Sequence, residues 1–114
     1  MQKSQLKNIF FNLPEKQLDA EIFETLLQNS NVRLERIITT GQTTPDDQWY
    51  DQEQDEWVIL LKGQAALLLE NEGEISLQSG DYIYIKAHQK HKVTWTSPDE
   101  VCVWLALHIC TDNK

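Results

Sequence analysis

The sequence predicts an all-β domain, built as a sandwich or a barrel. From residue 31 onward, short apolar runs rich in Val, Ile, Trp and Tyr are separated by turn residues at close intervals. That spacing is typical of sandwiches and barrels. The runs at 57–61 and 65–69 are continuously apolar, which indicates strands that meet little solvent on either face.

Each expected strand is bounded by residues that favour turns. Gly41, Gly63 and Gly80 end or precede three of them, and Ser97-Pro98-Asp99 separates the last two. Glycine permits backbone conformations that strands do not use, and proline fixes φ, so both residues tend to end strands. The expected strands are 32–40, 56–62, 64–70, 74–78, 81–87, 91–96 and 100–109.

Residues 14–28 are compatible with two structures. Leu18, Ile22 and Leu26 recur at helical spacing, whereas 21–27 could pair with 32–40 across the turn at Asn29-Ser30-Asn31. We favour the strand, because a small barrel gains more from an added hairpin than from a single helical turn. Residues 1–31 are therefore expected to form a strand or hairpin extension that packs on a barrel of residues 32–114.

Length and charge limit the classes of function. A chain of 114 residues makes one domain, and its net charge of −8 argues against nucleic acid and anionic membrane partners. No apolar run is long enough to span a membrane, and the first residues lack the features of a signal peptide, so a cytoplasmic location is expected. Cys102 and Cys110 are expected to be small buried residues in a reducing compartment.

Two segments together resemble the paired motifs of the cupin superfamily. Gly41, Glu56 and Gly63 match the first motif, with six residues between the glutamate and the last glycine. Gly80 and His91 match the second motif, which runs from a glycine through a strand to a turn histidine. The resemblance covers about residues 32–109. It implies a small β-barrel or jelly roll whose open end holds a metal or a ligand, usually in a homodimer.

The chain departs from the resemblance at the ligands. The two histidine positions of the first motif fall at Trp49 and Asp51, or at Tyr50 and Gln52, and neither choice supplies an imidazole. Only Glu56 carries over from that motif. The metal candidates that the resemblance implies are therefore Glu56 and His91, with Asp51 as a third ligand and His88 or His108 as the source of a second imidazole.

A site of this composition would favour particular ions. Oxygen-rich donor sets suit Mn²⁺ or Fe²⁺ better than Zn²⁺, which prefers three or four nitrogen or sulfur ligands. The sequence is thus compatible with one weakly bound divalent ion (Mn, Fe or Zn) or with none. His88 also fits a surface turn, and His108 also fits a hydrogen-bonded core histidine.

Aromatic residues near these positions predict an apolar-walled ligand pocket. Trp49 and Trp95 take the place of pocket-facing residues in the resemblance, and Tyr50 and His108 complete the expected lining. Apolar walls with a few convergent polar groups are the usual anatomy of a small-molecule site.

Two functions follow. The first is a cupin barrel that binds a small molecule, with the metal optional, because both histidines of the first motif are missing. The alternative is a metal-dependent enzyme similar to the sugar-phosphate isomerase or oxygenase cupins. The acidic segment from Asp46 to Glu56 would repel a phosphosugar.

Overall fold

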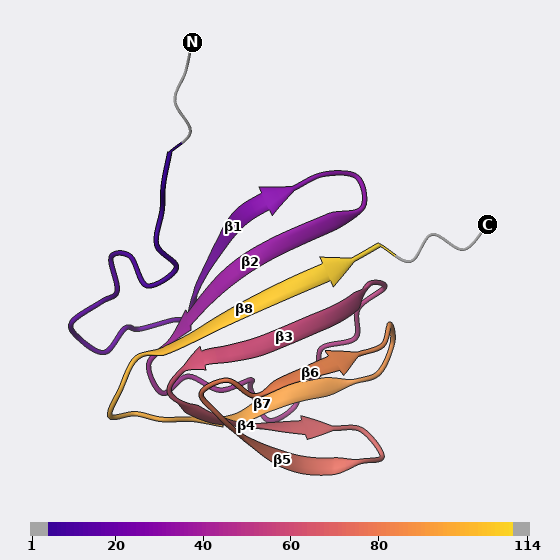
Figure 1. The fold of residues 1–114 in the computed structure, drawn as a ribbon. Helices are drawn as coiled ribbons and strands as arrows, with labels where there is room; N and C mark the ends of the chain where they lie inside the picture. The colour runs from indigo at the N-terminus through magenta and orange to yellow at the C-terminus, as the bar shows by residue number, and fades with distance from the viewer. Residues whose placement is uncertain (1–4, 111–114) are drawn as a thin grey trace.

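The computed structural model describes residues 5–110 and confirms the all-β fold. Eight strands make two antiparallel sheets that face each other, and the described residues contain no helix (Figure 1). The strands are β1 (Ile22–Gln28), β2 (Val32–Thr39), β3 (Asp55–Lys62), β4 (Gln64–Leu69), β5 (Gly73–Gln78), β6 (Tyr82–Ile85), β7 (His91–Thr96) and β8 (Cys102–Ile109).

The order of strands in the sheets differs from their order in the chain. The larger sheet runs β1-β2-β8-β3-β6, and the smaller one runs β5-β4-β7. The chain therefore passes from one sheet to the other at the turns after β3, β5, β6 and β7. In Figure 1 the last strand, β8, lies between β2 and β3, so that the first and last strands of the barrel segment, β2 and β8, pair with each other inside the larger sheet.

Residues 22–28 form a strand and not a helix, the two possibilities that the sequence left open. β1 pairs with β2, with Phe23 opposite Ile37. The turn between them is fixed by Asn29, whose Oδ1 accepts hydrogen bonds from the backbone N–H of Asn31 (2.7 Å) and Val32 (3.0 Å). Side chains of this kind stabilise turns by satisfying backbone donors locally.

Alternation along β3 points one set of its residues into the space between the sheets. Glu56, Val58 and Leu60 are buried, while Trp57 and Ile59 on the other face are only partly covered. Successive side chains in a strand point to opposite faces, so Glu56 shares its face with the core residues. The core contains Val58, Leu60, Ala65, Leu67, Leu69, Leu77, Ile85, Cys102, Trp104 and Ala106.

Gly63 makes the tight turn from β3 in one sheet to β4 in the other. Its φ of 101° lies in the region that side chains disfavour. A Cβ atom at this position would also lie 2.5 Å from the sulfur of Cys102. Both the backbone conformation and the packing thus require glycine at position 63, the second glycine of the first motif.

The two cysteines differ in exposure. Cys102 is buried as expected, but Cys110 is exposed, because it follows the last residue of β8 and leaves the barrel. The expectation that both are buried is wrong for Cys110. Within residues 5–110, no helix is long and apolar enough to cross a membrane.

Candidate functional site

A cavity of about 280 Å³ lies between the two sheets. Its volume is close to the lower limit of about 300 Å³ for small-molecule sites. One part of its wall is apolar and consists of Phe23, Ile37, Val58, Leu67, Ile85, Val93 and Trp104. The other part is polar and consists of Glu21, Arg33, Glu35, Tyr50, Gln52, Glu56, His91 and His108.

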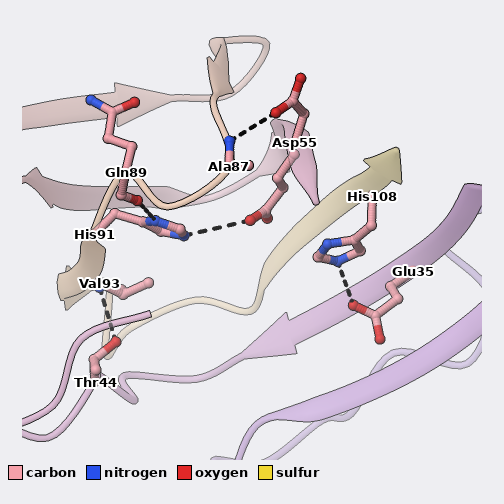
Figure 2. A network of polar contacts seen from close by, with 9 residues as sticks. Glu35, Thr44, Asp55, Ala87, Gln89, His91, Val93 and His108 are labelled. Atoms are coloured by element: carbon pink, nitrogen blue, oxygen red, sulfur yellow. Dashed lines mark hydrogen bonds and ion pairs between the residues drawn. The ribbon is translucent and has the colours of Figure 1, made fainter. Parts of the chain in front are cut away.

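Glu56 and His91 approach each other from different sheets, and both line this cavity. His91 Nε2 lies 3.5 Å from Glu56 Oε1, and the two residues are only 5% and 8% exposed. His91 Nδ1 is 3.0 Å from the carbonyl oxygen of Gln89 (Figure 2). A carbonyl only accepts, so Nδ1 carries a hydrogen, and Nε2 of neutral His91 presents a lone pair toward the carboxylate.

The environment of His91 changes the proton affinity of the imidazole. Burial lowers its pKa, but the side-chain contact and negative charge of Glu56 and the hydrogen bond to Gln89 raise it more, so the pKa of His91 lies above its usual value. Protonation gives Nε2 a hydrogen to donate to Glu56. The pair is therefore able to hold and transfer a proton at Nε2 inside a buried space.

A second histidine–glutamate pair lies on the neighbouring strands of the larger sheet. His108 Nε2 on β8 is 3.0 Å from Glu35 Oε1 on β2, and Figure 2 draws this contact as a dashed line. His108 is 5% exposed, and its Nδ1 has no hydrogen-bond partner. In the β3–β8 register His108 is directly opposite Glu56, so both side chains point to the same face.

Tyr50 covers His91. Their rings are stacked with centroids 5.6 Å apart, and their backbones exchange two hydrogen bonds of 2.8 and 3.1 Å. Burial raises the pKa of the Tyr50 hydroxyl, and the negative charges of Glu21, Glu56 and Glu35 raise it further. Three carboxylates therefore contribute negative electrostatic potential at this hydroxyl.

The structure places the predicted site residues in two groups. Glu56, His91, Tyr50 and His108 line the cavity. Asp51 and His88 instead pair with each other on the surface, outside the cavity lining: His88 Nδ1 is 2.9 Å from Asp51 Oδ1, with side chains 66% and 43% exposed.

Two predicted aromatic residues also lie outside the cavity lining. Trp49 and Trp95 are 40% and 44% exposed, and the ammonium of Lys92 lies 4.8 Å from the centre of the Trp49 ring. Trp104 lines the cavity in their place, and its Nε1 donates to Thr39 Oγ1 at 3.2 Å. Trp104, Ala106 and His108 occupy every second position of β8 and therefore share one face of the strand. This alternation is the sequence signal that could have identified Trp104 as a cavity residue.

Sequence reasoning missed four polar residues of the cavity: Glu21, Arg33, Glu35 and Gln52. Arg33 and Glu35 lie in the alternating strand 32–40 on the face of Ile37, so alternation indicates their common side. No motif distinguished Arg33 and Glu35 from ordinary charged residues of a half-exposed strand, whereas Gln52 falls at one of the alternative histidine positions of the first motif.

The donors at the cavity do not fit a tightly bound metal ion. Glu56 and His91 supply two candidate ligands; His108 contacts Glu35 through Nε2, and its unpartnered Nδ1 is not grouped with them closely enough to complete a site among the described residues. Zinc sites and facial iron sites use at least three protein ligands. Among residues 5–110, no three His, Cys, Asp or Glu side chains are grouped closely enough to hold an ion.

Comparison with protein families gives one match. The family model described as "Cupin domain" matches residues 36–109, which include all the strands from β3 to β8 and part of β2. Among curated protein sequences, none matches the chain.

Solved structures resemble the whole fold. A protein from Ralstonia eutropha JMP134, provisionally assigned as a mannose-6-phosphate isomerase, is 37% identical, with 93% of this chain and 98% of that chain covered and a TM-score of 0.89. An RmlC-like cupin family protein of Methanocaldococcus jannaschii with a double-stranded β-helix fold is 15% identical, with 86% and 87% covered and a TM-score of 0.66.

A third structure has the same fold at low identity. The polyketide cyclase RemF of Streptomyces resistomycificus is 19% identical, with 86% of this chain and 70% of that chain covered and a TM-score of 0.68. Similarity at this level reflects the architecture of the two sheets and does not extend to the chemistry of their sites.

Proposed function

The chain belongs to the cupin superfamily, and we propose that it binds a small molecule in the cavity between its two sheets. The observation that carries the proposal is the buried pair of Glu56 and His91, which approach each other to 3.5 Å in the wall of a cavity of about 280 Å³. Charged groups are costly to bury without full hydrogen bonding, so hydrogen bonds from a ligand would stabilise this pair.

A ligand would meet a polar and an apolar wall at once. Glu56 Oε1 is buried without a hydrogen-bond partner and is ready to accept one. Leu67 and Val93 from the smaller sheet and Trp104 from the larger one supply apolar surface nearby. Such a combination gives affinity through burial and orientation through hydrogen bonds.

The proposal is tested by screening small polar compounds for an increase in melting temperature. A ligand that binds only the folded state raises this temperature as its concentration rises. Glu56→Gln with His91→Gln should abolish the increases. The matched control is Asp51→Asn with His88→Gln, which neutralises a carboxylate and removes an imidazole at the exposed pair and should retain the increases. Hits that survive the cavity variant, or no hits in the parent protein, would refute binding at this site.

The alternative function is a metal-dependent enzyme that acts on a sugar phosphate. The observation that favours it is the 37% identity to the provisionally assigned mannose-6-phosphate isomerase. Glu56 and His91 would serve as the proton-transferring groups. The cavity has three glutamates and one arginine, which disfavour a phosphate dianion, so we place this function second.

The alternative is tested by metal content and turnover. Mn, Fe and Zn per chain are measured in the parent protein and in Glu56→Ala with His91→Ala, and isomerisation of mannose 6-phosphate is assayed after loading each metal. About one ion per chain that is lost in the variant, with turnover, would establish the enzyme. Background metal in both proteins and no turnover would exclude it.

We also propose that the protein forms a homodimer through β1. This strand pairs with β2 on one side, and no strand among residues 5–110 covers its other edge. Phe23, Leu26 and Leu27 on it are 50%, 46% and 49% exposed. An edge strand with several exposed apolar side chains favours pairing with another chain. Light scattering should show a dimer that Leu26→Lys with Leu27→Lys dissociates, whereas a monomeric parent protein would refute the proposal.

A further inference from the structure

Building on the proposed function, we infer that the ligand is a small hydroxyl-rich compound that is uncharged or carries an ammonium group, and that anions are rejected. Three features of the cavity support this class of ligand. They are the buried atoms that lack hydrogen-bond partners, the signs of the charges around them, and the volume of the cavity.

Three unpartnered acceptor atoms belong to the polar wall. Gln52 Oε1 and Glu56 Oε1 are buried oxygens without a hydrogen-bond partner, and His108 Nδ1 is a buried nitrogen in the same condition. Because His108 Nε2 faces the Glu35 carboxylate, the hydrogen of the neutral ring belongs on Nε2, and Nδ1 accepts. A ligand that leaves such atoms unpaired forfeits binding energy, so the favoured ligand presents several donors.

Hydroxyl and ammonium groups meet this requirement. Each hydroxyl donates one hydrogen and an ammonium donates three, whereas carboxylate and phosphate dianions only accept. The one unpartnered donor, Arg33 Nε, is able to bind a hydroxyl oxygen of the same compound. A hydroxyl both donates and accepts, which suits a wall with three acceptors and one donor.

The charges around the cavity favour the same class of ligand. Glu21, Glu35 and Glu56 line it, while Arg33 is the one lysine or arginine among the described residues of the lining. The Arg33 guanidinium lies 3.7 Å from Glu35, and its side chain is 40% exposed. Glu56 is paired with His91 at 3.5 Å, whereas Glu21 has no ion-pair partner within residues 5–110. An entering anion would therefore be repelled by Glu21, and an entering ammonium would be attracted to it.

Lys92, which follows His91 in the chain, does not offset this excess. Lys92 Nζ donates to the backbone carbonyl of Asp46 at 2.6 Å and lies against Trp49, away from the cavity lining. The volume of about 280 Å³ accommodates a single six-membered ring with its substituents. One face of such a ring, made of C–H groups, would contact Trp104 and the aliphatic wall.

The test uses three sugars that share one ring and differ in charge: glucosamine, glucose and glucuronate. Titration calorimetry at pH 6.5 and low salt should give affinities in that order, with glucosamine at least tenfold tighter than glucuronate. Glu21→Gln should reduce the ratio of these two affinities about threefold or more. Glu53→Gln, an equal change at an exposed residue outside the cavity, should leave the ratio unchanged.

Each other result overturns the inference. Glucuronate binding as tightly as glucosamine would show that anions are accepted, and an unchanged ratio in Glu21→Gln would show that this carboxylate does not select charge. If none of the sugars binds while the compound screen gives hits that depend on Glu56 and His91, the ligand class is wrong and the proposed function stands. If the screen is also empty, both fail.

Discussion

Glu56 on β3 and His108 on β8 occupy directly opposite positions in their antiparallel register, and both line the cavity. Arg33 on β2 is opposite His108 on its other side, which extends the row of polar residues across three strands. His91 meets this row from the smaller sheet. The polar wall is thus built on strand pairing, which fixes the side chains more rigidly than loops would.

Replacement of Glu21 by glutamine should stabilise the protein at neutral pH. Burial raises the pKa of the Glu21 carboxyl, so the folded protein binds its proton more readily than the unfolded chain does. Stability from this group is fully present below the unfolded pKa and is lost as pH rises through the folded pKa. Glu21→Gln should therefore raise the melting temperature relative to the parent protein at pH 7 and have little effect at pH 4.

Melting curves of both proteins across this range check the prediction. Glu15→Gln, which alters an exposed glutamate of the same segment, serves as the control and should follow the parent protein at every pH. A lower melting temperature for Glu21→Gln at pH 7 would contradict the expected penalty.

Replacement of Asp55 by asparagine should have the opposite dependence on pH. The Tyr84 hydroxyl and the Ala87 N–H donate to the Asp55 carboxylate and hold its pKa below the usual value. Its stabilisation is present above the unfolded pKa and is lost as pH falls through the folded pKa. Asp55→Asn should thus lower the denaturation midpoint at pH 7 and lower it much less at pH 3.

The same hydrogen bonds suggest a companion variant. Tyr84→Phe removes one of the two donors, and it should reproduce part of the loss seen in Asp55→Asn. Equal losses at pH 3 and pH 7 in Asp55→Asn would show that the carboxylate charge is not involved.

Alanine at Gly63 should destabilise the fold more than alanine at Gly73. Both glycines have positive φ, 101° and 93°, which costs about 1–2 kcal/mol for a residue with a side chain. At Gly63 the new methyl would also collide with Cys102, adding about 1–3 kcal/mol of overpacking, whereas no atom lies within 4 Å of the corresponding position at Gly73. Urea denaturation of both variants gives the difference, and equal losses would mean that the strand turn moves to relieve the contact.

Trp104 should report ligand binding by its fluorescence. Of the four tryptophans, it is the one that lines the cavity, and Trp95 is exposed on the outside. A fluorescence change that accompanies binding should disappear in Trp104→Phe and persist in Trp95→Phe. A signal that is lost in Trp95→Phe instead would place the ligand on the outer surface.

Much of the fold follows from local sequence patterns. Glycines at the strand ends and alternating or continuous apolar runs located seven of the strands, because turn conformation and burial are decided over a few residues. The segment 14–28 was ambiguous since Leu18, Ile22 and Leu26 suit a helix. Its strand depends on pairing with β2, a contact that the segment itself does not encode.

The site was less predictable than the fold. Spacing between glycines indicated Glu56 and His91, which the structure brings within 3.5 Å of each other. It could not indicate Glu35, because the contact with His108 joins residues 73 positions apart. The backbone also turns His88 outward, with φ of 65°, into a surface pair with Asp51 that sequence spacing does not distinguish from a cavity position.

The difference between the two thiols offers a practical handle on the cavity. Cys110 is exposed and lies two residues beyond His108 along the chain, whereas Cys102 is enclosed in the core. A maleimide dye should consequently attach to Cys110 without mutagenesis and leave the interior thiol unmodified. The label would sit at the end of the strand that carries His108, where a change of its emission could follow occupancy in real time.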